Sequence, residues 1–152
     1  VMYSYEFPLI AAQSAVYAIE LTEDKRERTE LLQAALRWAE VIARECPPTT
    51  GRRWKKEIEE TLPNVKTTGG TYAENYGRAI SFFVGLYHIT KDVAHLQRAN
   101  MLAREAVDKL YVNGIFRGHP AKDYYQANDG VGFLLHALMQ LDALPGRWRL
   151  AF

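Results

Sequence analysis

The sequence lacks several features that mark common functional classes. It contains a single cysteine, Cys46, so the chain cannot form an internal disulfide. No apolar run approaches the roughly 20 residues that a membrane-spanning helix needs, and we expect no membrane contact. The net charge of +1 gives no strong field to attract nucleic acid. There is no histidine–cysteine cluster spaced for zinc, no phosphate-binding loop and no nucleic-acid motif. We therefore expect no metal, no cofactor and no nucleic-acid partner.

Strand-like alternation is also missing, and helical periodicity dominates instead. Apolar residues recur at helical spacing in five long segments, at about residues 6–22, 26–45, 72–90, 92–111 and 129–143. A shorter helix is expected near 52–61. Asp24 and Asp92 are expected to cap the second and fourth long helices, and Asn113-Gly114 to end the fourth. The third long helix is apolar on most sides, which predicts burial on several faces.

The long helices form an internal repeat. Residues 16–17 of the first align with residues 86–87 of the third, and residues 32–33 of the second align with residues 96–97 of the fourth. Short turns join the helices of each pair, whereas longer linkers join one pair to the next. The sequence therefore predicts tandem antiparallel helical hairpins, each with a buried inner helix and an amphipathic outer helix.

One hairpin carries a resemblance to a known class. Residues 86–92 (Leu-Tyr-His-Ile-Thr-Lys-Asp), followed by 96–99 (Leu-Gln-Arg-Ala) and 114–116 (Gly-Ile-Phe), resemble a repeat of the six-hairpin (α/α) toroid glycosidases and polysaccharide lyases. The resemblance covers nearly the whole chain and implies a partial (α/α) toroid, about half of the full ring. We expect residues 1–152 to be one domain. The five long helices make about two and a half hairpins, whereas the full toroid of this class has twelve helices. We therefore expect a fragment of a larger toroid, an arc-shaped domain, or an open edge covered by another chain.

The stretch 111–135 concentrates the candidate chemistry. Glycine and proline interrupt it, an apolar helix follows it, and it is rich in titratable and aromatic residues: Arg117, His119, Lys122, Asp123, Tyr124, Tyr125 and Asp129. A loop of this composition that leads into a helix N-terminus is where a helical protein would place a site.

Four residues are the candidate catalytic groups: Asp123, Asp129, Glu74 and His119. Paired carboxylates can act as acid and base in glycoside hydrolysis. For elimination from a uronate, Arg117 would neutralise the carboxylate, and His119 or a tyrosine would move the proton. Structural roles remain open for each. Asp129 fits a helix N-cap, and His119 fits a turn. Asp123 and Glu74 fit either solvated loop charges or ion-pair partners of Arg117 and Arg78.

Tyrosine-rich stretches precede all three inner helices, and in the toroid class such linkers line the substrate cleft. The candidate substrate-binding residues are Tyr5, Trp54, Tyr72, Tyr76, Arg117, Tyr124 and Tyr125. Aromatic faces can stack on sugar rings, but core packing of the linkers is the competing interpretation. We expect the three stretches to share one rim.

The resemblance and these residues together predict a carbohydrate-active domain that acts on an oligo- or polysaccharide, in a hydrolase-like or lyase-like manner. The alternative is a non-catalytic helical-repeat module that binds a protein or peptide between its inner helices. Convergence of the tyrosine-rich linkers on one face would favour the first. The sequence assigns no compartment.

Overall fold

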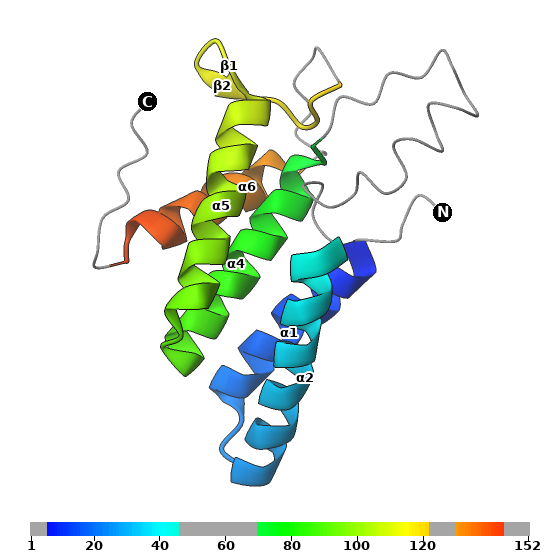
Figure 1. Cartoon of the computed structure of the whole chain (residues 1–152), viewed down its shortest axis with the longest axis vertical. Helices are drawn as coiled ribbons and strands as arrows, with labels where there is room; N and C mark the ends of the chain where they lie inside the picture. The colour runs from blue at the N-terminus through cyan, green and yellow to red at the C-terminus, as the bar shows by residue number, and fades with distance from the viewer. Residues whose placement is uncertain (1–5, 46–69, 122–129, 145–152) are drawn as a thin grey trace, which may run out of the picture.

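The computed structural model describes residues 6–45, 70–121 and 130–144, and this part of the chain is mostly helical (Figure 1). Its helices are α1 (Glu6–Leu21), α2 (Lys25–Glu45), α4 (Ala73–Thr90), α5 (Val93–Leu110) and α6 (Val131–Asp142). All five long helices expected from periodicity are present, with boundaries that differ by one or two residues. The short helix expected near 52–61 lies outside the described residues.

Both aspartate caps are confirmed. One side-chain oxygen of Asp24 accepts hydrogen bonds from the backbone N–H groups of Arg26 at 2.7 Å and Glu27 at 3.0 Å. Asp92 accepts from the backbone N–H of Ala94 at 2.9 Å. The first N–H groups of a helix have no partner inside it, so each carboxylate satisfies donors that would otherwise be left unpaired. These caps fix where α2 and α5 begin.

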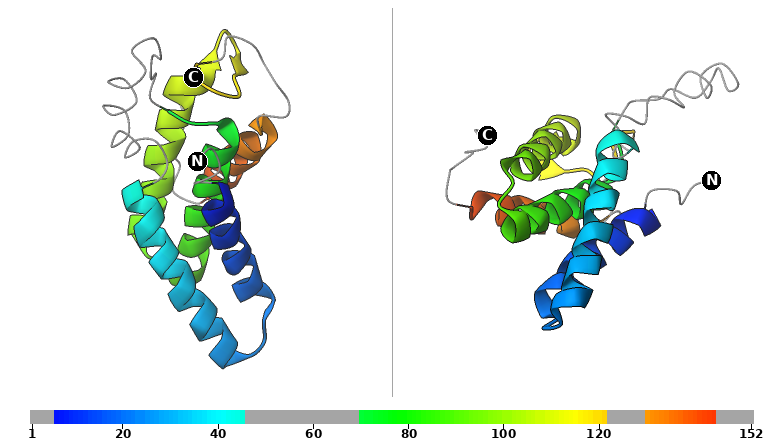
Figure 2. Two further views of the ribbon diagram at one scale, coloured as in Figure 1. Left: turned by 90° about the vertical axis from the view of Figure 1, so that its right-hand side faces the viewer. Right: turned by 60° about the horizontal axis from the view of Figure 1, so that its bottom comes forward.

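Helix α4 lies at the centre of the bundle, with α1 on one side and α6 on the other (Figures 1 and 2). The outer helices pack on the inner ones, α2 on α1 and α5 on α4. Gln13 bonds to Arg78 and Val16 lies against Gly85, so α1 and α4 run in the same direction. The described helices therefore form tandem hairpins packed against one another. They show no toroid.

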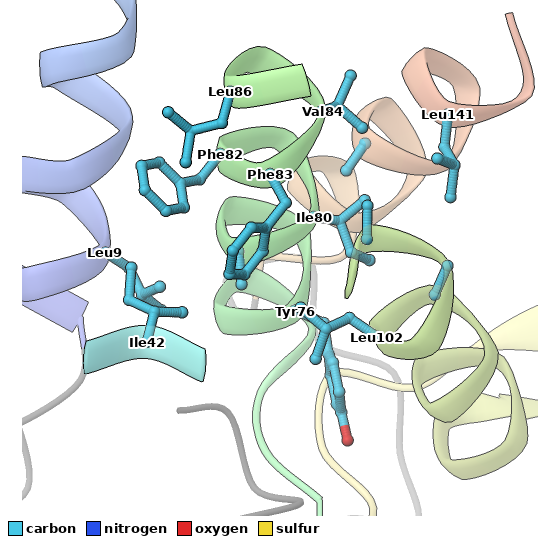
Figure 3. Packing of buried hydrophobic residues seen from close by; sticks show 14 of the residues in the cluster. Leu9, Ile42, Tyr76, Ile80, Phe82, Phe83, Val84, Leu86, Leu102 and Leu141 are labelled. Carbon is cyan, nitrogen blue, oxygen red and sulfur yellow. The ribbon is translucent and has the colours of Figure 1, made fainter. Parts of the chain in front are cut away.

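The core is centred on α4, as its apolar sequence predicts. Phe82, Phe83 and Leu86 project from α4 toward residues of the neighbouring helices, and all three are nearly or wholly buried (Figure 3). Leu9 of α1 and Ile42 of α2 complete the core on one side (Figure 3). Burial of large side chains at about 1.5–3 kcal/mol each makes this cluster the main source of stability.

A short β-hairpin follows α5, where we expected no strand. Strands β1 (Tyr111–Val112) and β2 (Ile115–Phe116) pair antiparallel. Asn113 and Gly114 form the turn with φ values of +52° and +87°, and α5 has already ended at Leu110. Asn-Gly is the preferred pair for a two-residue hairpin turn. The sequence prediction was therefore wrong to make Asn113-Gly114 a helix stop, because the pair acts as a hairpin turn instead.

The described part of the chain lacks two kinds of feature. None of the described helices combines the length and the apolar character needed to cross a membrane. The described side chains also include no cluster of three or more His, Cys, Asp or Glu residues able to hold a metal ion.

Candidate functional site

The linker that leads into α4 and the loop that follows β2 are joined at one end of the bundle (Figure 1). The backbone N–H of Ala73 donates to the carbonyl oxygen of Gly118 at 2.8 Å. The rings of Tyr72 and His119 lie with their centroids 4.6 Å apart, tilted by 49°. Two of the candidate residues, far apart in the sequence, are therefore in direct contact.

Glycine makes this close approach possible. Gly70 has a φ of +86°, and a Cβ atom there would lie 2.7 Å from the Pro120 ring. Positive φ strains any residue that carries a Cβ atom, and the short distance would force Pro120 to move. The linker can therefore lie directly on the loop at this position.

The start of α6 rests on the first turn of α4. A Cβ atom on Gly130 would lie 2.2 Å from the Cβ atom of Glu74, and Gly130 has a φ of +77°. Gly130 is also the N-cap residue of α6, so the N-cap interpretation of Asp129 is wrong. Glu74 is thus placed between the linker of α4 and the entrance to α6.

An arginine that sequence reasoning considered only as a partner for Glu74 organises the neighbouring polar groups. Arg78 lies 2.7 Å from Glu74 through Nη2 and donates from Nε to the same oxygen, Oε1, at 2.8 Å. Its Nη1 donates to Gln13 Oε1 at 3.1 Å, and its guanidinium lies 4.2 Å from the centre of the Phe133 ring. The Arg78 side chain is 15% exposed and that of Glu74 22% exposed. Arg78 thereby links all three inner helices.

This arrangement confirms the ion-pair interpretation of Glu74. The i,i+4 spacing of Glu74 and Arg78 was the sequence signal for it. Sequence reasoning missed Gln13 and Phe133, because their contacts with Arg78 depend on how α1 and α6 pack against α4.

Tyr76 belongs to the core rather than to the exposed rim. Its side chain is fully buried, and its hydroxyl donates to Glu105 Oε1 of α5 at 3.0 Å. Burial, reinforced by the negative charge of Glu105, raises the pKa of the phenol well above its ordinary value. Tyr76 stays neutral and leaves no ring face for a ligand.

His119 is partly buried and held by its own loop. Its Nδ1 accepts a hydrogen bond from the backbone N–H of Ala121 at 3.1 Å, so a neutral imidazole carries its proton on Nε2. Arg117, two residues earlier, is also partly buried, and its backbone N–H donates to the carbonyl of Leu110 at 2.8 Å. This bond holds the hairpin against the end of α5, and the loop after the hairpin places His119 beside Tyr72.

Of the eleven candidate residues, the structure brings Tyr72, Glu74 and His119 to one end of the bundle. Six further candidates lie outside the described residues: Tyr5, Trp54, Asp123, Tyr124, Tyr125 and Asp129. Comparisons with protein-family models, with curated proteins and with solved structures found no match to this chain.

Proposed function

We propose that this chain is a carbohydrate-active domain whose saccharide site lies where the linker of α4 meets the loop after β2. The contact between the Tyr72 and His119 rings carries the proposal, because it joins two candidate residues at one surface. Tyr72 is 41% exposed, so one part of its ring is accessible while the other packs on His119. A half-exposed aromatic with a polar tip is suited to the apolar face and hydroxyls of a sugar.

Glu74, two residues after Tyr72 at the same end of the bundle, is the proposed polar group of this site. Both contacts of Arg78 with Glu74 are made to Oε1, so among the described residues Oε2 is the oxygen that would accept hydrogen bonds from sugar hydroxyls. Arg78 fixes the rotamer of Glu74 in advance, so less side-chain entropy is lost when a ligand binds. Glu74 acts here as a binding residue.

A catalytic role would come from the connection between Ala121 and Gly130. Both described ends of this connection border the site, and it contains Asp123 and Asp129. In a hydrolase these carboxylates would protonate the leaving oxygen and assist the nucleophile, at a separation of about 5–10 Å. In a lyase, Arg117 would neutralise a uronate carboxylate and His119 would transfer the proton.

Binding is tested with a glycan array, followed by saturation-transfer NMR on the strongest ligand. We expect Tyr72→Ala to reduce affinity at least tenfold, the equivalent of about 1.4 kcal/mol. The control is Met139→Ala, which truncates an exposed side chain on α6. If both variants bind as tightly as the wild type, or if no saccharide binds at all, the proposed site is refuted.

Catalysis is tested separately with Asp123→Asn and Asp129→Asn. Hydrolysis releases a new reducing end, whereas elimination produces an unsaturated sugar that absorbs in the ultraviolet. If a variant still binds the saccharide but no longer forms the product, the carboxylate that it replaces takes part in the reaction. Binding without turnover of any polymer in the wild type restricts the proposal to recognition.

A non-catalytic interaction module is the second candidate, and the outer faces of the end helices favour it. Leu21 on α1 and Met139 on α6 are 83% and 71% exposed, and Tyr17 and Leu135 are nearly half exposed. Apolar groups gathered on one helix face often mark a protein partner. In this case Leu135→Ser with Met139→Ser would abolish partner binding, whereas Tyr72→Ala would leave it unchanged.

A further inference from the structure

The hairpin turn presents an asparagine in an open setting. Asn113 and Gly114 are both exposed, and apart from Gly114 and its two chain neighbours no described residue has an atom within 4 Å of where a Cβ atom of Gly114 would be. The strands that hold the turn are two residues each. A two-stranded hairpin of this size is marginal by itself and opens locally far more easily than the helical core.

We propose that Asn113 is a site of spontaneous deamidation, with water as the only co-reactant. When the turn opens, the backbone nitrogen of Gly114 loses its proton and attacks the side-chain carbonyl carbon of Asn113. A C–N bond forms, the side-chain nitrogen leaves as ammonia, and a five-membered succinimide remains. Water then opens the ring at one of its two carbonyls. One opening gives aspartate, and the other gives isoaspartate, whose main chain runs through the former side chain.

Glycine is the residue that permits this attack, because it places no side chain beside the nucleophilic nitrogen. The other described asparagines provide a contrast. The Asn75 amide donates to Thr71 Oγ1 at 2.9 Å, and the Asn100 amide donates to the carbonyl of Leu96 at 3.0 Å. Both lie inside helices, where the next backbone nitrogen is held by the helix itself.

The two products have different consequences for the fold. Aspartate tolerates positive φ, so the turn survives with one added negative charge. Isoaspartate lengthens the main chain by one atom, which is incompatible with a two-residue turn. The hairpin lies between α5 and Gly118, which bonds to Ala73. Isoaspartate at Asn113 is therefore expected to disturb the contact between the linker that leads into α4 and the loop that follows β2.

The site is tested by ageing the folded full chain in mildly alkaline buffer and mapping tryptic peptides by mass. Each described asparagine falls in a different peptide: Leu110–Arg117 for Asn113, Thr67–Arg78 for Asn75 and Ala99–Arg104 for Asn100. We expect Leu110–Arg117 to deamidate many-fold faster than the other two and to split into aspartate and isoaspartate forms. Isoelectric focusing should show a more acidic form of the protein, because each deamidation lowers the formal net charge of +1 by one.

Asn113→Gly is the matched control, since Gly-Gly also forms this turn but has no side-chain amide. It should fold normally and lose the new acidic species. Amide exchange at Ala73 then reports on the linkers, and we expect faster exchange in the aged wild type than in aged Asn113→Gly. Equal, slow deamidation of all three peptides would overturn the proposal.

Discussion

Gly77 in α4 and Gly132 in α6 allow one substitution to be tested in two opposite settings. A Cβ atom on Gly77 would lie 2.4 Å from the carbonyl carbon of Phe133 and 2.5 Å from the backbone nitrogen of Leu134. On Gly132, no described atom outside its chain neighbours and the adjacent backbone of α6 lies within 4 Å of the added Cβ. Both glycines are helical residues, so alanine fits the backbone conformation at each position.

The expected magnitudes follow from two terms. Replacing glycine by alanine in a helix interior stabilises it by about 0.5–1 kcal/mol. Carbon atoms pack best at about 3.5–4.0 Å, so Gly77→Ala must push α6 away from α4 by about 1 Å. Such overpacking costs about 1–3 kcal/mol or more because helix backbone, unlike a flexible side chain, cannot rotate aside. Gly132→Ala should thus stabilise the protein, by less than the helix-interior value because Gly132 is the second residue of α6, whereas Gly77→Ala should destabilise it by about 1–2 kcal/mol.

The assay is urea denaturation of the wild type and both variants, with the loss of helix monitored by far-ultraviolet circular dichroism. In a thermal melt, 1 kcal/mol corresponds to about 2–4 °C for a chain of this size. A Gly77→Ala variant as stable as the wild type would refute the close contact between α4 and α6. A destabilised Gly132→Ala variant would show that the exposed face of α6 is covered in solution.

Three further predictions concern individual side chains. Tyr76→Phe should cost about 1–2 kcal/mol at neutral pH by leaving Glu105 without its donor. Above pH 10.0 the wild type should lose stability, because the phenol of Tyr76 ionises in the unfolded chain but not in the folded core. Tyr76→Phe should lose less stability over the same pH range. Partial burial lowers the pKa of His95 below its ordinary 6.5, so stability should fall as the pH drops below that value, and His95→Gln should flatten this dependence in urea titrations. Asp24→Ala should cost about 1 kcal/mol through loss of the α2 cap, measured against Asp142→Ala as a surface control.

The helices could be predicted from the sequence because their signals are local. The apolar spacing that identified α1, α2, α4, α5 and α6 reflects the face that each helix buries, and the caps at Asp24 and Asp92 need only neighbouring backbone. The Asn113-Gly114 turn was equally local. It was missed because strands of two residues are too short to show alternation, which left the pair to be interpreted as a helix end.

The candidate site was harder to predict because its tyrosines look alike in the sequence. Tyr72 and Tyr76 stand four residues apart in one stretch, yet the first is 41% exposed and the second is fully buried. Tyr76 shares helical spacing with Phe83, and both side chains contact α5, through Glu105 and His95 respectively. Tyr72 lies before the first residue of α4, so the helical spacing does not apply to it and its side chain stays partly exposed. Periodicity separates the two only once the start of α4 is known.

The contact between the linker before α4 and the loop after β2 depends on a backbone hydrogen bond between residues far apart in the sequence. The N–H of Ala73 lies at the first position of α4, where no helical carbonyl is available to it. The carbonyl of Gly118 satisfies this donor, and the absence of a Cβ atom at Gly70 allows Pro120 to approach. The same bond that completes the helix end therefore brings His119 to Tyr72. Nothing in the local sequence of either segment encodes the other as its partner, so the pairing required the folded arrangement of α4, α5 and the hairpin.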